Sequence, residues 1–207
     1  MYSATVWTDP KLYASHFHAA IGLDAFFHSF QQRAKGDRVI VPTEVDQAFL
    51  ESREPEFEPI RNLAMGHRLE QIRAADEEIA SRSARLIDAE RQLEMKRAKA
   101  AGHSSCRISY KITQARRRRE ALVQGVEQFE VGRMFPGSFV PIVTMQDARM
   151  VVRPMRYQCR PAHVERRMEN MLESPHHARK DRLQGRWQQE FGHTHGVIAV
   201  ESFFEAV

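Results

Sequence analysis

The feature that most constrains the fold is a long central region, residues 61–130, in which glycine and proline are nearly absent. Both residues disfavour helix interiors, so their scarcity favours long helices here. The first half repeats an apolar residue every seven positions, with Leu69 as an additional one: Met65, Ile72, Ile79, Leu86 and Leu93. The second half alternates steps of three and four, apart from one position held by Arg119: Ile108, Ile112, Ala115, Leu122, Val126 and Phe129. Both patterns predict amphipathic helices with a narrow apolar stripe.

A short segment, residues 101–105, separates the two patterns. Its sequence, AGHSS, places a glycine and two serines between the apolar repeats, and this composition favours a break in the helix. We therefore expect an antiparallel helical hairpin, with one helix over roughly 61–100 and the other over 105–130.

Charge is concentrated in the same region. The chain has 31 Lys and Arg against 27 Asp and Glu, a net charge of +4. Residues 96–119 hold nine basic residues and no acidic one, so the remainder of the chain carries −5. A basic block on an acidic protein predicts an anionic partner, with nucleic acid first. The residues expected to contact DNA are a run of four arginines, Arg116, Arg117, Arg118 and Arg119. The alternative is that the run is only a solvated helix face.

The flanking regions have a different pattern. Residues 11–33 are rich in aromatic residues at helical spacing, which is typical of a core helix. Residues 34–60 contain Gly36 and three prolines and predict a connector, with one strand candidate over 38–41. From Met134 onward the apolar period approaches two and predicts three strands, over 139–143, 149–153 and 196–200, with Pro136-Gly137 as a turn. The fold class is therefore α+β: one domain over 1–207, with a β-rich body interrupted by the 61–130 hairpin.

Several classes of protein are disfavoured by composition. No segment approaches the ~20 consecutive apolar residues of a membrane span. The first ten residues have neither the basic start nor the apolar core of a signal peptide. The two cysteines, Cys106 and Cys159, form no CxxC pair, which argues against a disulfide framework or a cysteine zinc site. We expect a soluble cytoplasmic protein without a cofactor and without a membrane partner.

Five short segments carry a resemblance to a known family. They are YSATVW (2–7), PMRYQCRP (154–161), HARKD (177–181), FGHTHG (191–196) and FFE (203–205). In this order the segments resemble the SOS response-associated peptidase (SRAP) family of abasic-site processing proteins, in a subgroup with a long helical insertion. The resemblance implies an SRAP-like body and a partner, single-stranded DNA with abasic sites. It also implies a cytoplasmic location, on the nucleoid if the source is a bacterium.

The resemblance also implies a covalent chemistry. In the family, an N-terminal cysteine exposed by loss of the initiator methionine attacks the ring-opened aldehyde of an abasic site. Its amine and thiol together close a thiazolidine, which is a stable DNA–protein cross-link. An Asn, a Glu and a more C-terminal His assist by moving protons. The Glu also acts in the autocleavage that exposes the cysteine.

This sequence departs from the family pattern at three places. Tyr2 follows Met1 directly, where relatives have a cysteine between these two residues. His177 stands at the position of the Asn, and the assisting His would lie beyond Val207. The resemblance thus implies that the chain lacks the N-terminal cysteine and the C-terminal part, so that its body is incomplete and the polypeptide as written forms no thiazolidine.

Glu205 and His177 are the catalytic candidates on this basis, and Glu205 matches the family motif. Arg179 matches as well, and its planar guanidinium suits a phosphate. The resemblance adds two further DNA-contacting candidates, Arg156 and Arg160. Tyr157 and Trp187 are candidates for base stacking, although a core role is favoured for Trp187.

Two other functions remain open. The first is a non-catalytic nucleic-acid-binding or interaction protein whose active element is the basic hairpin. The second, ranked lower, is a metallohydrolase that uses His193, His195 and the pair His176-His177. No acidic ligand is placed beside these histidines, and we expect no metal site.

Overall fold

A computed structural model of the 207-residue chain gives the fold. The structure describes residues 3–96, 99–125, 133–160, 164–165, 178, 180–185, 187–192 and 195–204. For residues 3, 92–96 and 99–104 it describes the backbone alone.

The chain divides into two compact units. The first combines residues 1–64 with residues 130–207, and the second comprises residues 65–129. We call the first the α/β body and the second the two-helix unit. Within the described ranges, no helix is both long and apolar enough to cross a lipid bilayer.

Three helices build the helical layer of the body: α1 (Pro10–Phe17), α2 (Leu23–Ala34) and α3 (Thr43–Glu51). Helix α1 begins with a capping residue, because the Asp9 carboxylate accepts a hydrogen bond from the Lys11 backbone N–H at 2.8 Å. Pro10 occupies the first turn, where a missing N–H costs nothing. A short 3-10 turn, η1 (Pro55–Phe57), then leads into the long helix α4 (Glu58–Lys96).

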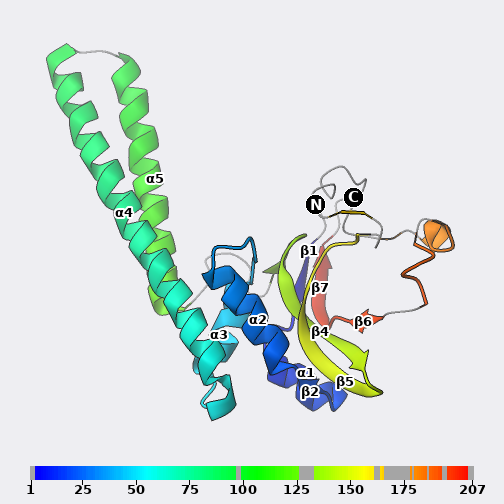
Figure 1. The fold of residues 1–207 in the computed structure, drawn as a ribbon. Coiled ribbons are helices and arrows are strands. Elements are labelled where there is room, and N and C mark those ends of the chain that lie inside the picture. Colours follow the sequence, from blue (N-terminus) through cyan, green and yellow to red (C-terminus); the bar gives the residue numbers. More distant parts are fainter. Residues whose placement is uncertain are drawn as a thin grey trace. The chain divides into compact units, whose positions relative to one another are not determined.

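Two sheets complete the body (Figure 1). The three-stranded sheet has the order β3-β1-β7, with β1 (Ser3–Val6) between β3 (Arg133–Met134) and β7 (Val200–Phe204). The four-stranded sheet has the order β2-β5-β4-β6: β2 (Ala20–Ile21), β5 (Arg149–Arg156), β4 (Phe139–Gln146) and β6 (Gly196–Val197). Asp147 and Ala148, both at positive φ, form the tight turn between β4 and β5.

Strand β4 contributes to both hydrophobic clusters of the body, because its two faces are buried. Val143 packs with aromatic residues of the helices, among them Tyr13, Phe26 and Phe49. Val140 and Ile142 pack instead with a smaller cluster, formed with Ala4, Val6 and Met134. This explains the continuous apolar run that predicted the strand, since a strand buried on both faces loses strict alternation.

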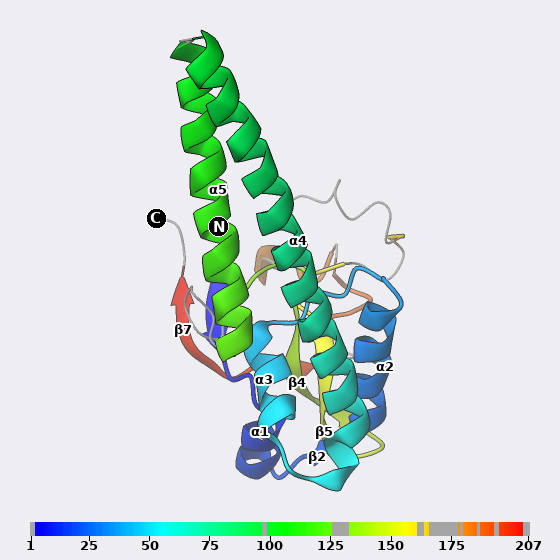
Figure 2. The ribbon, with the colours of Figure 1, turned by 90° about the vertical axis from the view of Figure 1, so that its left-hand side faces the viewer.

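The two-helix unit is built from α4 and α5 (Lys99–Gln124). The two helices lie side by side and run in opposite directions (Figures 1 and 2). Their buried seam contains the small side chains of Ala75 and Ala115 together with Ile112. Two arginines of α5 also form ion pairs across the seam with acidic residues of α4, Arg118 with Glu78 and Arg119 with Asp76.

The sequence-based prediction of the helix break at 101–105 is wrong. Helix α5 begins at Lys99 and runs through Gly102 and both serines. One glycine costs a helix only about 1 kcal/mol relative to alanine, and two good helix formers of α5, Ala100 and Ala101, directly precede it. The apolar stripe of α4 is also only partly buried: Ile72, Ile79 and Leu86 are half-buried, whereas Met65 and Leu69 are 43% and 57% exposed.

Three further predictions are corrected. Residues 38–41 form no strand; Ile40 makes only an isolated bridge to Ser138. The connector 34–60 contains helix α3, which the prolines on either side concealed. The segment 196–200 belongs to two strands in different sheets, because the chain crosses from β6 to β7 at Ile198 and Ala199. The strands over 139–143 and 149–153 and the turn at Gly137 are confirmed.

Candidate nucleic-acid interface

Three of the predicted site residues lie outside the described residues: Glu205, His177 and Arg179. The same holds for His176 and His193. The described part of the chain nevertheless includes Phe204, which immediately precedes Glu205 and ends strand β7.

The end of β7 lies beside the start of β1. Ser3 pairs with Phe204 and Ala4 with Phe203 in an antiparallel register. On the other side of β1, Thr5 pairs with Arg133 of β3. The sheet thus brings the beginning of the chain, the residue before Glu205 and an arginine to one place.

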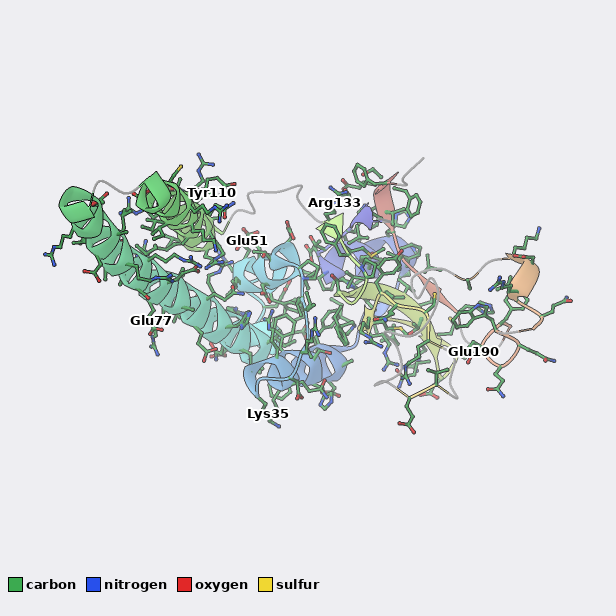
Figure 3. The ribbon with its side chains drawn as sticks, turned by 90° about the horizontal axis from the view of Figure 1, so that it is seen from above. Lys35, Glu51, Glu77, Tyr110, Arg133 and Glu190 are labelled. Atoms are coloured by element: carbon green, nitrogen blue, oxygen red, sulfur yellow. The ribbon has the colours of Figure 1, made fainter. Side chains whose placement is uncertain are left out.

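Arg133 covers the end of β7. Its guanidinium carbon lies 4.6 Å from the centroid of the Phe204 ring and 5.3 Å from that of Phe135. Figure 3 labels Arg133 on β3, which pairs with β1 at the edge of the sheet opposite β7. Cation–π contacts of this kind hold the guanidinium over the ring faces. Phe203, in contrast, is 58% exposed.

Arg156 and Arg160 lie at and just beyond the end of β5. Arg156 pairs with Phe139 of β4, is half-buried and has interaction partners of its own. Arg160 is exposed and donates a hydrogen bond to the Val164 carbonyl. Both side chains therefore have local anchors, and the exposed guanidinium of Arg160 is the more accessible of the two.

The aromatic candidates near these arginines are partly or fully buried. Tyr157 packs against the smaller hydrophobic cluster, and burial raises its pKa. Trp187 is 9% exposed, which agrees with the core role that the sequence favoured. Burial also raises the pKa of the Cys159 thiol, which disfavours its thiolate form.

The four arginines of the run on α5 differ in whether they form ion pairs. Arg118 and Arg119 form ion pairs with Glu78 and Asp76 of α4. The hydrogen bond from Arg118, and then that from Arg82, lower the pKa of the Glu78 carboxyl. Arg116 and Arg117 are exposed, and no ion pair joins them to a carboxylate among the described residues. Half of the predicted run is therefore already paired within the protein.

An open hollow of about 600 Å³ lies between α4 and α5. Among the side chains that the structure describes, those that line it include four cations and no carboxylate: Arg82, Arg85, Cys106, Arg107, Ile108, Tyr110, Lys111 and Gln114. Both helices contribute, with Arg82 and Arg85 one turn apart on α4 and Arg107 and Lys111 one turn apart on α5. This surface has the composition of a binding site for an anionic ligand.

No protein-family model, curated protein or solved structure matches this chain. A functional proposal therefore depends on the motifs in its sequence and on the geometry of its own side chains.

Sequence reasoning missed Arg133 and the two arginines of the hollow on α4. Arg82 and Arg85 lie in a stretch with mixed charges, and only their position opposite α5 places them with Arg107. The sequence did contain a usable signal. Cations spaced i, i+3 on one helix and i, i+4 on another, in two helices expected to pair, can predict a shared cationic surface. Nothing in the sequence distinguishes Arg133 from any other strand arginine.

A metal site finds no support within the described residues. No group of three or more His, Cys, Asp or Glu side chains lies close enough there to hold a metal ion. His195 is described and exposed.

Proposed function

We propose that this protein binds single-stranded DNA that contains abasic sites, through an SRAP-like body with an inserted helical hairpin. The five sequence segments named above support this proposal. The structural observation that supports it best is the pairing of β1 with β7, because Ser3 lies opposite Phe204, one residue before Glu205.

The chemistry explains why that pairing matters. A thiazolidine forms when an N-terminal amine and the thiol of the same residue add to an aldehyde and release one water. The proton transfers need an acid or base close to the amine. The register that sets Ser3 opposite Phe204, one residue before Glu205 in the sequence, supports such an arrangement.

The cross-link itself needs a residue that this sequence does not have at position 2. The N-terminal amine of the chain as written belongs to Met1, whose side chain has no thiol, so an aldehyde would form at most a reversible imine. The proposal for the polypeptide as written is therefore recognition of the DNA without a stable adduct. His177, where relatives have Asn, and Glu205 are the residues proposed to move protons.

The test uses a single-stranded oligonucleotide with one abasic site and its undamaged twin. The 207-residue chain should bind both and leave no heat-stable adduct on a denaturing gel. A variant with Cys inserted between Met1 and Tyr2, after removal of the methionine, should form the adduct with the abasic strand alone. A heat-stable adduct with the unmodified chain, or none with the inserted cysteine, would contradict the proposal.

The arginine run gives a second test. Each phosphate contact on a single strand changes the slope of log affinity against log salt by about 0.7. Replacing Arg116 and Arg117 with Gln should therefore reduce the slope by about 1.4. The matched pair Arg118→Gln and Arg119→Gln should reduce it less, because these arginines are already paired with Glu78 and Asp76. Equal changes would show that the two pairs of arginines do not differ in access to DNA.

A second candidate function is non-catalytic nucleic-acid binding by the two-helix unit alone. The hollow lined by four cations favours it. The two candidates differ in their dependence on the lesion: binding by the two-helix unit should be equal for abasic and undamaged strands, and an inserted cysteine should not change it.

A further inference from the structure

The hollow between α4 and α5 has an unbalanced charge. Of its four cations, Arg82 has a carboxylate partner, Glu78, at 2.7 Å. No ion pair joins Arg85, Arg107 or Lys111 to a carboxylate among the residues whose side chains the structure describes. The acidic residues of α4 that do form pairs across the seam, Asp76 and Glu78, are used by Arg118 and Arg119. Three of the four cations that line the hollow therefore have no ion pair to a described carboxylate.

An aromatic side chain lies among these cations. Tyr110 is 64% exposed, so a ligand can reach its ring. Its hydroxyl accepts a hydrogen bond from the Gln114 side-chain amide at 2.9 Å, one turn further along α5. Figure 3 shows Tyr110 on α5. The hydrogen bond orients the ring, and Ile108 adds an apolar part to the lining.

We propose that this hollow binds a short segment of single-stranded nucleic acid, with phosphates on Arg85, Arg107 and Lys111 and a base stacked on Tyr110. Grooves for single strands combine cations for the backbone with an aromatic platform for the bases. The volume lies within the range of about 300–1,000 Å³ that is typical of ligand sites. The inference rests on the proposed function only in taking the polymer to be a nucleic acid, and it requires neither an abasic site nor Glu205.

An acidic polypeptide is the competing occupant. Its carboxylates would use the same three cations, but it has no planar base to gain from an exposed, oriented ring. The presence of Tyr110 in the cationic lining therefore favours the nucleic acid, and a polypeptide serves as a competitor in the third experiment.

The first experiment compares two double variants of the full chain on undamaged oligo-dT. Arg85→Gln with Arg107→Gln removes two cations of the hollow. Arg73→Gln with Arg91→Gln removes two exposed cations of α4 that do not line it. The hollow variant should bind roughly tenfold or more weakly near 0.1 M salt, with the salt slope lowered by about 1.4. Equal losses in both variants would overturn the proposal, because they would show a general charge effect.

The second experiment tests the stacking platform. Tyr110→Ala should weaken binding of oligo-dT by about 5- to 150-fold, the equivalent of one base–aromatic stack. Tyr110→Phe keeps the ring and should bind nearly as well as the parent. Far-UV circular dichroism of each variant checks that the helices are intact. Unchanged binding by Tyr110→Ala with intact helices would refute the base-stacking site.

The third experiment reads occupancy directly through Cys106, which lines the hollow and is exposed. In a Cys159→Ser background, Cys106 is the one remaining thiol of the chain. Oligo-dT should slow its reaction with a small maleimide, and polyglutamate at equal charge concentration should slow it less. Equal protection by polyglutamate would assign the surface to an acidic polypeptide instead. Because every DNA strand here is undamaged, these outcomes are independent of whether the body recognises abasic sites.

Discussion

The α/β body and the two-helix unit use charged residues in opposite ways. In the body, Arg33 of α2 and Asp46 of α3 form a buried bidentate pair, with N–O distances of 2.9 and 2.7 Å. The Arg33 guanidinium also lies 4.7 Å from the Phe30 ring centroid. In the two-helix unit, Glu78 and Asp76 pair with arginines that remain at the surface. A buried pair fixes two helices against each other, whereas surface pairs contribute little stability and leave charge accessible.

The α/β body and the two-helix unit also differ in how much apolar side chain they bury. Phe49 of α3 contacts three aromatic rings edge-on, those of Phe26, Phe30 and Phe57, at centroid distances of 5.1, 5.4 and 5.5 Å. The fully buried residues of the two-helix unit are mostly alanines. The body therefore derives its stability from a large core, and the two-helix unit retains an exposed, charged surface that a partner can use.

The largest expected effect is on the free energy of unfolding of the body, when its buried ion pair is broken. Asp46→Asn should destabilise the body by about 3–5 kcal/mol, because it leaves the Arg33 cation buried without a counter-charge. Both tryptophans of the chain, Trp7 and Trp187, belong to the body, so urea unfolding followed by tryptophan fluorescence measures this effect. Asp37→Asn, in the exposed loop after α2, is the matched control and should change the midpoint little.

The next effect belongs to the two-helix unit. Ile112→Ala should cost about 2 kcal/mol, the lower end for a large-to-small change, because a seam between two helices has few neighbours around the side chain. Helicity measured by circular dichroism should be lost at lower urea, while the tryptophan fluorescence midpoint stays in place. A parallel shift of both signals would show that the two units unfold together. It would contradict the view that the body and the two-helix unit are stabilised separately.

A smaller effect depends on alkaline pH and on Tyr13 of the body. The Tyr13 hydroxyl donates to the Ala199 carbonyl and accepts from the Ala199 N–H at 3.2 Å, and burial raises the Tyr13 pKa to about 12. Because the folded-state pKa lies above the ordinary value of 10.0, the contribution is complete below pH 10 and is lost between pH 10 and 12. Tyr13→Phe should cost about 1 kcal/mol at neutral pH through the lost hydrogen bonds.

The same variant should flatten the alkaline decline. Urea midpoints by fluorescence at pH 9 and pH 11 check this, since Trp7 lies 5.7 Å from Tyr13 between ring centroids. An equally steep decline in Tyr13→Phe would assign the alkaline sensitivity to other groups.

The smallest effect concerns acid pH and Glu78 of the two-helix unit. Arg118 and Arg82 lower the Glu78 pKa from its ordinary value of 4.5, so the ion pairs stabilise the unit above that pH and are lost as the pH falls below it. Glu78→Gln should reduce the helicity change between pH 5 and pH 3, by a small amount because the pairs are exposed. Glu77→Gln, at the adjacent exposed position, is the control (Figure 3). Identical acid profiles for the two variants would contradict this role of Glu78.

Local sequence patterns predicted much of the secondary structure. Alternation and continuous apolar runs identified β4 and β5, and the scarcity of glycine and proline identified the two long helices. Helix ends were less predictable. Gly102 and its serines favour a break, yet α5 runs through them, because the cost of one glycine is small compared with the favourable propensity of a 26-residue helix. Helix α3 was missed since prolines mark a helix start as readily as a loop.

The candidate site was predicted only in part. The basic window was visible in the sequence, but its division into paired and unpaired arginines was not. Arg118 pairs with Glu78 and Arg119 with Asp76, which lie 40 and 43 residues away in the chain. Likewise, no local pattern places Arg133 over the Phe204 ring, because β3 and β7 are neighbours only through β1.

Sequence patterns alone were sufficient for the mixed α and β character, the two long helices, the strands β4 and β5 and the basic window, because each depends on residues close together in the chain. Three features required the tertiary structure: which arginines are paired, which cations line the hollow with Tyr110, and the pairing of Ser3 with Phe204. These features depend on long-range pairing, since a charge or a ring acquires its environment only when distant segments pack around it.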